Sequence, residues 1–242
     1  MDRPVGPRLV TVAPSAFAAE AARLIRGALL LSLESGEASM ALSGGQTPRA
    51  VYALLGRESV GELPYERCSF FFGDERWVDA RDPDSNAGEA IRSWFLPRRV
   101  PPSRIHPFFG KSPTEARRSV EDALRELADR QGATHPRLDL VLLGLGDDGH
   151  TASLFPHSEA LDERVAWTAE TTSPKPPPVR LTMTLPVLNA SRRVVFLVTG
   201  AEKKDVLERF VQGDPSLVAS RVQGPEVTVL ADLQAASGLR ME

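Results

Sequence analysis

Residues 138–156 read LDLVLLGLGDDGHTASLFP, and this stretch decides the fold. The apolar run over residues 140–143, with Leu138 just before it, is typical of a strand that is buried on both faces. Glycines follow at 144, 146 and 149, where the backbone can turn sharply and let a ligand come close. Ligands of open α/β sheets bind at the carboxyl ends of the strands. The polar residues among these glycines are therefore candidates for chemistry: Asp147, Asp148 and His150.

Strand-like and helix-like segments alternate along the rest of the chain. We expect further strands at residues 37–42, 67–72, 164–168, 180–184, 193–198 and 226–230. We expect helices at residues 15–36, from 47 onward, at 85–95, at 114–130 and at 201–211, with N-caps at Ser15 and Thr47 and with Pro48 as the first residue of the second helix. This alternation predicts an α/β fold with a mostly parallel sheet and helices on both faces.

Two proline-rich segments, residues 101–113 and 173–178, are predicted to be connections. We find no internal repeat and no shift in composition along the chain. The sequence therefore predicts a single domain over residues 1–242.

Composition excludes several classes of protein. The chain has 242 residues, of which 42% are hydrophobic, and a formal net charge of -3, with acidic and basic residues interspersed. This is unlike the basic stripe of a nucleic-acid binder, and no apolar run reaches membrane-spanning length. The first ten residues contain no apolar core of a signal peptide. A single cysteine, Cys68, permits no internal disulfide and is expected to be a buried filler, which favours a cytoplasmic location.

Ser43, Gly44, Gly45 and Thr47 lie between a predicted strand and a predicted helix. Backbone N–H groups and hydroxyls at the start of a helix can bind a phosphate, although the segment lacks the GxxxxGK[ST] motif of nucleotide-binding loops. An ordinary tight turn between strand and helix is the alternative.

Three charged residues, Asp74, Glu75 and Arg76, follow the predicted strand at 67–72. Charges at the carboxyl end of a strand indicate a site, whereas an exposed turn with a local ion pair is the alternative. Farther along the chain, Arg180 could bind a phosphate through its planar guanidinium, and Lys203 could do so as a point charge. Each cation taken singly is more often a surface residue.

The glycines of residues 144–149 formally match the GxGxxG fingerprint of dinucleotide binding. Pro156, however, leaves room for only about a turn and a half of helix after the third glycine, which disfavours that interpretation. A metal site at His150, with Asp147, Asp148 and His157 nearby, fits no standard zinc spacing. Ser153 does not lie in the GxSxG motif of serine hydrolases.

Six stretches taken together resemble the 6-phosphogluconolactonase family, part of a wider group that includes glucosamine-6-phosphate deaminases. They are SGGQTP (43–48), FFGDERWV (71–78), DSN (84–86), GLGDDGHTASLFP (144–156), SPKPPPVRLTMTLPVLN (173–189) and VTGAEKKDVL (198–207). The resemblance implies a modified Rossmann-like α/β fold that binds no dinucleotide. It also implies hydrolysis of 6-phospho-D-glucono-1,5-lactone to 6-phosphogluconate, with no metal or organic cofactor.

We hypothesise that neutral His150 takes a proton from the attacking water, with either Asp148 or Asp74 orienting its ring. Arg76 would hold the substrate and stabilise the oxyanion, while the phosphate would lie on Ser43, Gly44, Gly45 and Thr47, beneath Arg180 and Lys203. We expect the only partner to be a small sugar phosphate, and the protein to be a monomer or a weak homo-oligomer. A deaminase-like enzyme of the same group and a non-catalytic sugar-phosphate sensor are the alternatives.

Overall fold

A seven-stranded parallel sheet forms the centre of the protein in a computed structural model that describes residues 6–57 and 63–239. Its strands follow the order β1 (Arg8–Val12), β10 (Glu226–Asp232), β9 (Arg193–Val198), β6 (Leu140–Leu143), β2 (Ala38–Leu42), β3 (Cys68–Phe72) and β5 (Ile105–His106). The inner strands β2, β3 and β6 are completely buried, as expected for a sheet covered on both faces.

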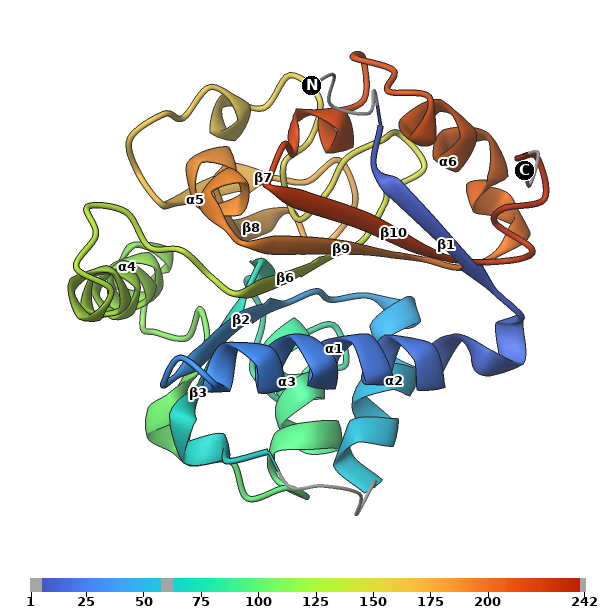
Figure 1. Cartoon of the computed structure of the whole chain (residues 1–242). Helices are drawn as coiled ribbons and strands as arrows, with labels where there is room; N and C mark the ends of the chain where they lie inside the picture. Colours follow the sequence, from blue (N-terminus) through green and yellow to red (C-terminus); the bar gives the residue numbers. More distant parts are fainter. Residues whose placement is uncertain (1–5, 58–62, 240–242) are drawn as a thin grey trace.

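Helices cover both faces of this sheet (Figure 1). On one side lie α1 (Phe17–Leu33), α2 (Gln46–Arg57) and α3 (Asn86–Ala90), the last continuing as a π-helical turn, Ile91–Phe95. On the other side lie α5 (Leu185–Ala190) and α6 (Lys204–Val211). The prediction of a mostly parallel sheet with helices on both faces is confirmed; a single domain over residues 1–242 stays a prediction.

A second, three-stranded antiparallel sheet was not predicted. Its strands are β4 (Asp74–Arg76), β8 (Val179–Met183) and β7 (Thr168–Thr172), with β8 in the middle. The segment that was interpreted as a turn or a site after β3 is thus a strand, β4. Its backbone pairs with β8, so that Asp74 lies opposite Thr182 and Arg76 opposite Arg180.

Several predicted boundaries are wrong for local reasons. Ser15 does not cap α1, because residues 14–16 form a separate 3-10 turn and the N-cap position is Ala16. The strand expected at 164–168 begins only at Thr168, as β7, because the Glu163 carboxylate accepts hydrogen bonds from the next three backbone N–H groups and holds that segment in a bend. The connection at 101–113 contains the short edge strand β5.

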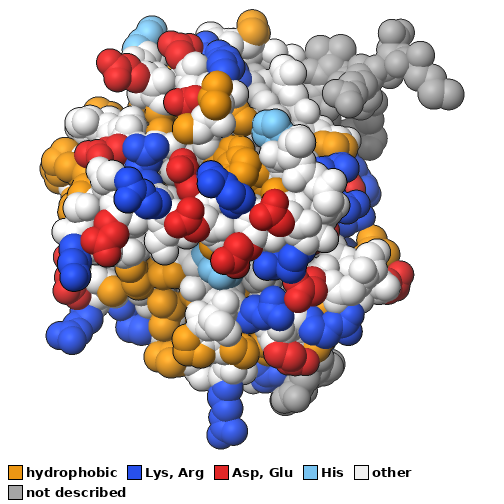
Figure 2. Space-filling model, turned by 90° about the vertical axis from the view of Figure 1, so that its left-hand side faces the viewer, with side chains coloured by type: hydrophobic (Ala, Val, Ile, Leu, Met, Phe, Trp, Pro, Cys, Tyr) orange, Lys and Arg blue, Asp and Glu red, His pale blue; other side chains and the backbone are white. Residues whose placement is uncertain are grey.

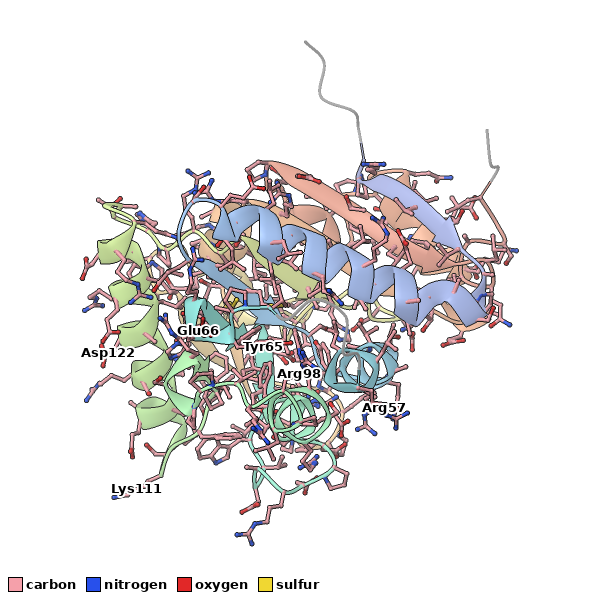
Figure 3. All side chains as sticks on the ribbon, turned by 60° about the horizontal axis from the view of Figure 1, so that its bottom comes forward. Arg57, Tyr65, Glu66, Arg98, Lys111 and Asp122 are labelled. Atoms are coloured by element: carbon pink, nitrogen blue, oxygen red, sulfur yellow. The ribbon has the colours of Figure 1, made fainter. Side chains whose placement is uncertain are left out.

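Other expectations hold. The helix expected at 85–95 is present as α3 and the π-helical turn after it, and Ser85 caps α3 by accepting a hydrogen bond from the Gly88 N–H group. α4 (Pro113–Arg130) carries charged residues such as Asp122 outward, as its amphipathic pattern predicts (Figure 3). Cys68 is fully buried. Acidic and basic side chains are interspersed over the face that includes α4 (Figure 2). Across the described ranges, no helix combines the length and apolarity needed to cross a membrane. The prediction that the first ten residues are not a signal peptide rests partly on residues 1–5, which lie outside these ranges.

An aromatic cluster attaches α2 and α3 to the sheet. Trp94 is fully buried, stacks on Tyr52 of α2 at 5.8 Å between ring centroids, and meets Phe70 of β3 edge-on at 5.4 Å. Its indole N–H donates to the hydroxyl of Tyr65, over whose ring Arg98 lies at 5.9 Å (Figure 3). The Tyr52 hydroxyl donates in turn to the Ser43 carbonyl at 2.7 Å. The core therefore fixes the backbone of the turn that follows β2.

Candidate active site

A cleft of about 540 Å³ opens at the carboxyl ends of the parallel strands. The chain leaves β2 toward β3 on one side and leaves β6 toward β9 on the other, so the order of strands reverses between β2 and β6. Ligands of open α/β sheets bind at such a switch point. All ten residues proposed for the site from the sequence line this cleft: Ser43, Gly44, Gly45, Thr47, Asp74, Arg76, Asp148, His150, Arg180 and Lys203.

His150 is paired with Asp148. The ring Nδ1 of His150 lies 2.5 Å from Asp148 Oδ1, and the His150 backbone N–H donates to the same oxygen at 3.1 Å. Burial acts to raise the pKa of Asp148, but the hydrogen bonds from His150 outweigh it and the pKa is lowered. The carboxylate is therefore ionised at neutral pH and favours a proton on Nδ1, which leaves Nε2 free to accept one.

Glycine is required beside this histidine. A Cβ atom at Gly146 would come within 2.1 Å of His150 Nδ1, so a larger residue would displace the ring from Asp148. No helix follows Gly149; residues 147–154 form turns closed by a bridge between Thr151 and Leu154. The short helix that was expected before Pro156 is thus absent. Dinucleotide-binding fingerprints continue into a long helix, and this segment does not.

The turn after β2 brings the start of α2 to the cleft. α2 begins at Gln46, so the prediction that Thr47 is its N-cap is wrong, and Thr47 lies in the first turn. There its hydroxyl is 2.8 Å from that of Thr199, at the end of β9. Ser43, Thr47 and the start of α2 form one wall of the cleft. The hydroxyls and the positive end of the helix dipole make this wall suitable for binding an anion.

Lys203 reaches the same wall from the turn before α6. Its Nζ lies 2.5 Å from Asp147 Oδ1, and this hydrogen bond lowers the pKa of Asp147. The loop after β6 therefore holds the cation through Asp147 and the imidazole through Asp148. These neighbouring carboxylates serve different partners.

The second sheet supplies three further residues of the cleft lining, Asp74, Arg76 and Arg180. Asp74 is buried; one of its carboxylate oxygens accepts from the Ser153 hydroxyl at 2.6 Å and the other from Asn86 Nδ2 at 3.1 Å. Asp74 is thus held by these two residues, whereas Asp148 contacts His150 directly. Arg180 is also buried and its Nε donates to the Pro177 carbonyl at 2.9 Å. Burial, and then the neighbouring Arg76, lower the pKa of Arg180.

Between Asp74 and Arg76, Glu75 points away from the cleft into the protein and is only 1% exposed. Its carboxylate accepts from three backbone N–H groups, those of Arg76, Asn86 and Ala87, at 2.7–2.8 Å, and from the Ser85 hydroxyl at 3.2 Å. Burial outweighs these hydrogen bonds and raises the pKa of Glu75 to about 7.

This pKa predicts a pH-dependent stability. A carboxyl whose pKa is higher in the folded than in the unfolded state makes the folded state lose stability as pH rises between the two values, here from about 4.5 to about 7. We expect the free energy of unfolding of the wild type to fall by roughly 2–3 kcal/mol relative to Glu75→Gln between pH 5 and pH 8. Urea denaturation of both proteins at the two pH values measures the difference. Parallel pH dependences would contradict the prediction.

Sequence reasoning missed several residues of the cleft. Asn86 and Ser153 hold Asp74, Thr199 meets Thr47, and Lys175 and Glu202 line the cleft. Asn86 and Ser153 lie within the stretches DSN and HTASLFP that carry the family resemblance, which was the available signal. Within residues 6–57 and 63–239, no three His, Cys, Asp or Glu side chains are grouped as the ligands of a metal ion would be.

A family model described as glucosamine-6-phosphate isomerases/6-phosphogluconolactonase matches residues 13–230. The chain belongs to this family. The 6-phosphogluconolactonase of Synechocystis sp. is 41% identical over 213 residues, which cover 86% of this chain and 87% of that protein. The resemblance inferred from the six stretches is confirmed.

Solved structures of the family share this fold. A 6-phosphogluconolactonase from Trypanosoma cruzi matches with a TM-score of 0.83 at 30% identity, covering 99% of each chain. A monomeric glucosamine-6-phosphate deaminase matches with a TM-score of 0.78 at 23% identity, covering 96% of this chain and 99% of that one. The second match shows the shared fold alone. The modified Rossmann-like fold implied by the resemblance is therefore confirmed.

Proposed function

We propose that this protein hydrolyses 6-phospho-D-glucono-1,5-lactone to 6-phosphogluconate. The observation that carries the proposal is the His150–Asp148 pair in one cleft with a helix N-terminus and Lys203. Relatives that match most of the chain bear the name 6-phosphogluconolactonase. We further propose that the reaction is the second step of the oxidative pentose phosphate pathway and takes place in the cytoplasm.

His150 acts as the general base and then as the general acid. With Nδ1 bonded to Asp148, Nε2 takes a proton from water as the water oxygen attacks the lactone carbon C1. The imidazolium, stabilised by the carboxylate, then donates that proton to the ring oxygen as the bond from C1 to this oxygen breaks. The lactone ester is reactive enough that no protein nucleophile is needed.

Arg76 stabilises the negative charge that develops on the carbonyl oxygen. Its Nη1 donates to the Asp84 carbonyl at 2.7 Å, which fixes the direction of the guanidinium. A group fixed in advance costs little reorganisation when charge appears in the transition state. Asp74 balances Arg76 and Arg180 on the same wall and completes a polar surface for the sugar.

The phosphate lies against the start of α2. The start of α2, with Ser43, Gly44, Gly45 and Thr47, supplies donors and the positive end of a dipole. Lys203 supplies a full positive charge, and Arg180 supplies a second one from β8. Binding of the phosphate holds C1 beside His150 and turns the attack by water into a reaction within one bound complex.

A direct assay tests this function. The protein should accelerate the hydrolysis of freshly prepared 6-phosphogluconolactone well above the spontaneous rate. It should accelerate the hydrolysis of glucono-1,5-lactone, which lacks the phosphate, far less. Ammonia release from glucosamine 6-phosphate would instead indicate the deaminase activity. Binding of sugar phosphates without turnover of either substrate would indicate a sensor.

A further inference from the structure

One charged residue of the cleft region has no part in the reaction described above. Glu75 lies between Asp74 and Arg76 in sequence, yet its side chain points into the protein. Burying a carboxylate that is only 1% exposed costs free energy. The hydrogen bonds that it accepts from three backbone N–H groups offset this cost only in part, since burial still raises its pKa. Its hydrogen bonds reach cleft residues, which a purely structural carboxylate need not do.

The first connection runs within β4. The Arg76 N–H donates to Glu75 Oε1 at 2.8 Å, so the carboxylate fixes the backbone from which Arg76 extends into the cleft. The Arg76 guanidinium is held at its far end by the carbonyl of Asp84. That carbonyl immediately precedes Ser85, whose hydroxyl also donates to Glu75. Glu75 therefore contacts the backbone of Arg76 directly and the residue next to the carbonyl that holds its guanidinium.

The second connection runs to the start of α3. Oε1 accepts from the Asn86 N–H at 2.7 Å and Oε2 from the Ala87 N–H at 2.8 Å. With its backbone fixed in this way, Asn86 donates through Nδ2 to the carbonyl and the carboxylate of Asp74. Its side chain also fills the space beside Gly44, where a Cβ atom would come within 1.9 Å of Asn86 Oδ1. The side chain of Asn86 thus lies between Asp74 and the Ser43–Gly45 turn that follows β2.

We propose that Glu75 is a positioning residue for lactone hydrolysis: its buried carboxylate holds Arg76 directly, and through Asn86 it sets the distance between Asp74 and the Ser43–Gly45 turn. The inference rests on the proposed function. It predicts that Glu75 affects kcat more than KM, because its carboxylate contacts Arg76, which acts in the transition state, whereas it reaches the phosphate-binding turn only indirectly, through Asn86.

The test compares Glu75→Gln with Glu89→Gln. Glu89 is on α3, the helix whose first residues contact Glu75; it forms an ion pair with Arg92 at 3.6 Å and does not line the cleft. At pH 8 we expect Glu75→Gln to lower kcat by roughly 10-fold to 100-fold, with KM within about threefold of the wild type, because small displacements of positioned groups have effects of this size. Glu89→Gln should match the wild type in both constants.

A role in stability alone would lower the melting temperature and the amount of active enzyme without this split between kcat and KM, so the melting temperature of each variant is measured as well. A kcat of Glu75→Gln within twofold of the wild type, or a loss that only follows the folded fraction, overturns the inference. The proposed function then still stands, because the wild type is assayed beside the variants. An inactive wild type overturns both.

Asn86→Ala decides the matter if Glu75→Gln does not fold. This variant keeps every backbone N–H group that donates a hydrogen bond to Glu75. It removes only the side chain that contacts Asp74 and Gly44. A lowered kcat supports the inference whether or not KM also rises, because Asn86 itself fills the space beside Gly44 in the turn assigned to the phosphate. Wild-type kinetics in Asn86→Ala overturn it.

Discussion

Replacing His150 by alanine is expected to lower kcat for 6-phosphogluconolactone by about 100-fold or more, the usual contribution of a positioned general base. The residual rate should approach the spontaneous hydrolysis of the lactone, which sets the lower limit of the measurement. The substitution leaves the hydrogen bonds of Thr47 and Lys203 intact, because the His150 ring contacts Asp148 and Phe155 instead. Binding of 6-phosphogluconate, measured by calorimetry, should therefore change little.

His157 offers a matched control seven residues away. It is exposed and has a positive φ of 63°, so His157→Asn is the suitable substitution, since asparagine tolerates this backbone conformation. This control should keep wild-type kinetics. If His150→Ala turns over as fast as the wild type, His150 has no part in the mechanism.

Lys203→Ala is expected to raise KM by roughly 10-fold to 100-fold, since a hydrogen bond to a charged group contributes about 1.5–3 kcal/mol. Removal of the ammonium also leaves the Asp147 carboxylate, now without this partner, facing the phosphate, and like charges repel. Both effects weaken binding of the phosphorylated lactone. Steady-state kinetics with 6-phosphogluconolactone measure the change.

The neighbouring Lys204 is exposed and does not line the cleft, so Lys204→Ala is the matched control and should behave as the wild type. Lys203 is a cleaner test of the phosphate wall than Arg180, because Arg180 also holds the carbonyl of Pro177. If Lys203→Ala abolishes turnover and leaves KM unchanged, the proposed division of the cleft is wrong.

The central strands could be predicted from the sequence because they are short, continuous apolar runs. The strand expected at 193–198 is β9, residue for residue. β1 was missed, since RLVTV is an edge strand that pairs with β10 from the far end of the chain and is only partly buried. α5 was missed because Leu185–Ala190 is too short for a periodic pattern and contains a proline in its first turn.

The site could be predicted only in part. Asp148 and His150 are two residues apart in a glycine-rich loop, so the sequence offered Asp148 as one of two candidates for pairing with the imidazole. The hydrogen bond between Ser153 and Asp74 joins residues 79 positions apart, one in the turns after β6 and the other in β4 of the second sheet, and no local pattern predicts such a contact. For the same reason, the sequence left open whether Asp74 or Asp148 orients the imidazole.

A crystal structure with 6-phosphogluconate bound tests the central claim most directly, because this product carries both C1 and the phosphate. We predict that the phosphate lies against the start of α2 within hydrogen-bonding distance of Lys203, and that the C1 carboxylate lies beside His150 Nε2 and the Arg76 guanidinium. A product bound in the reverse direction, with its phosphate at His150, or bound outside the cleft, would contradict the mechanism.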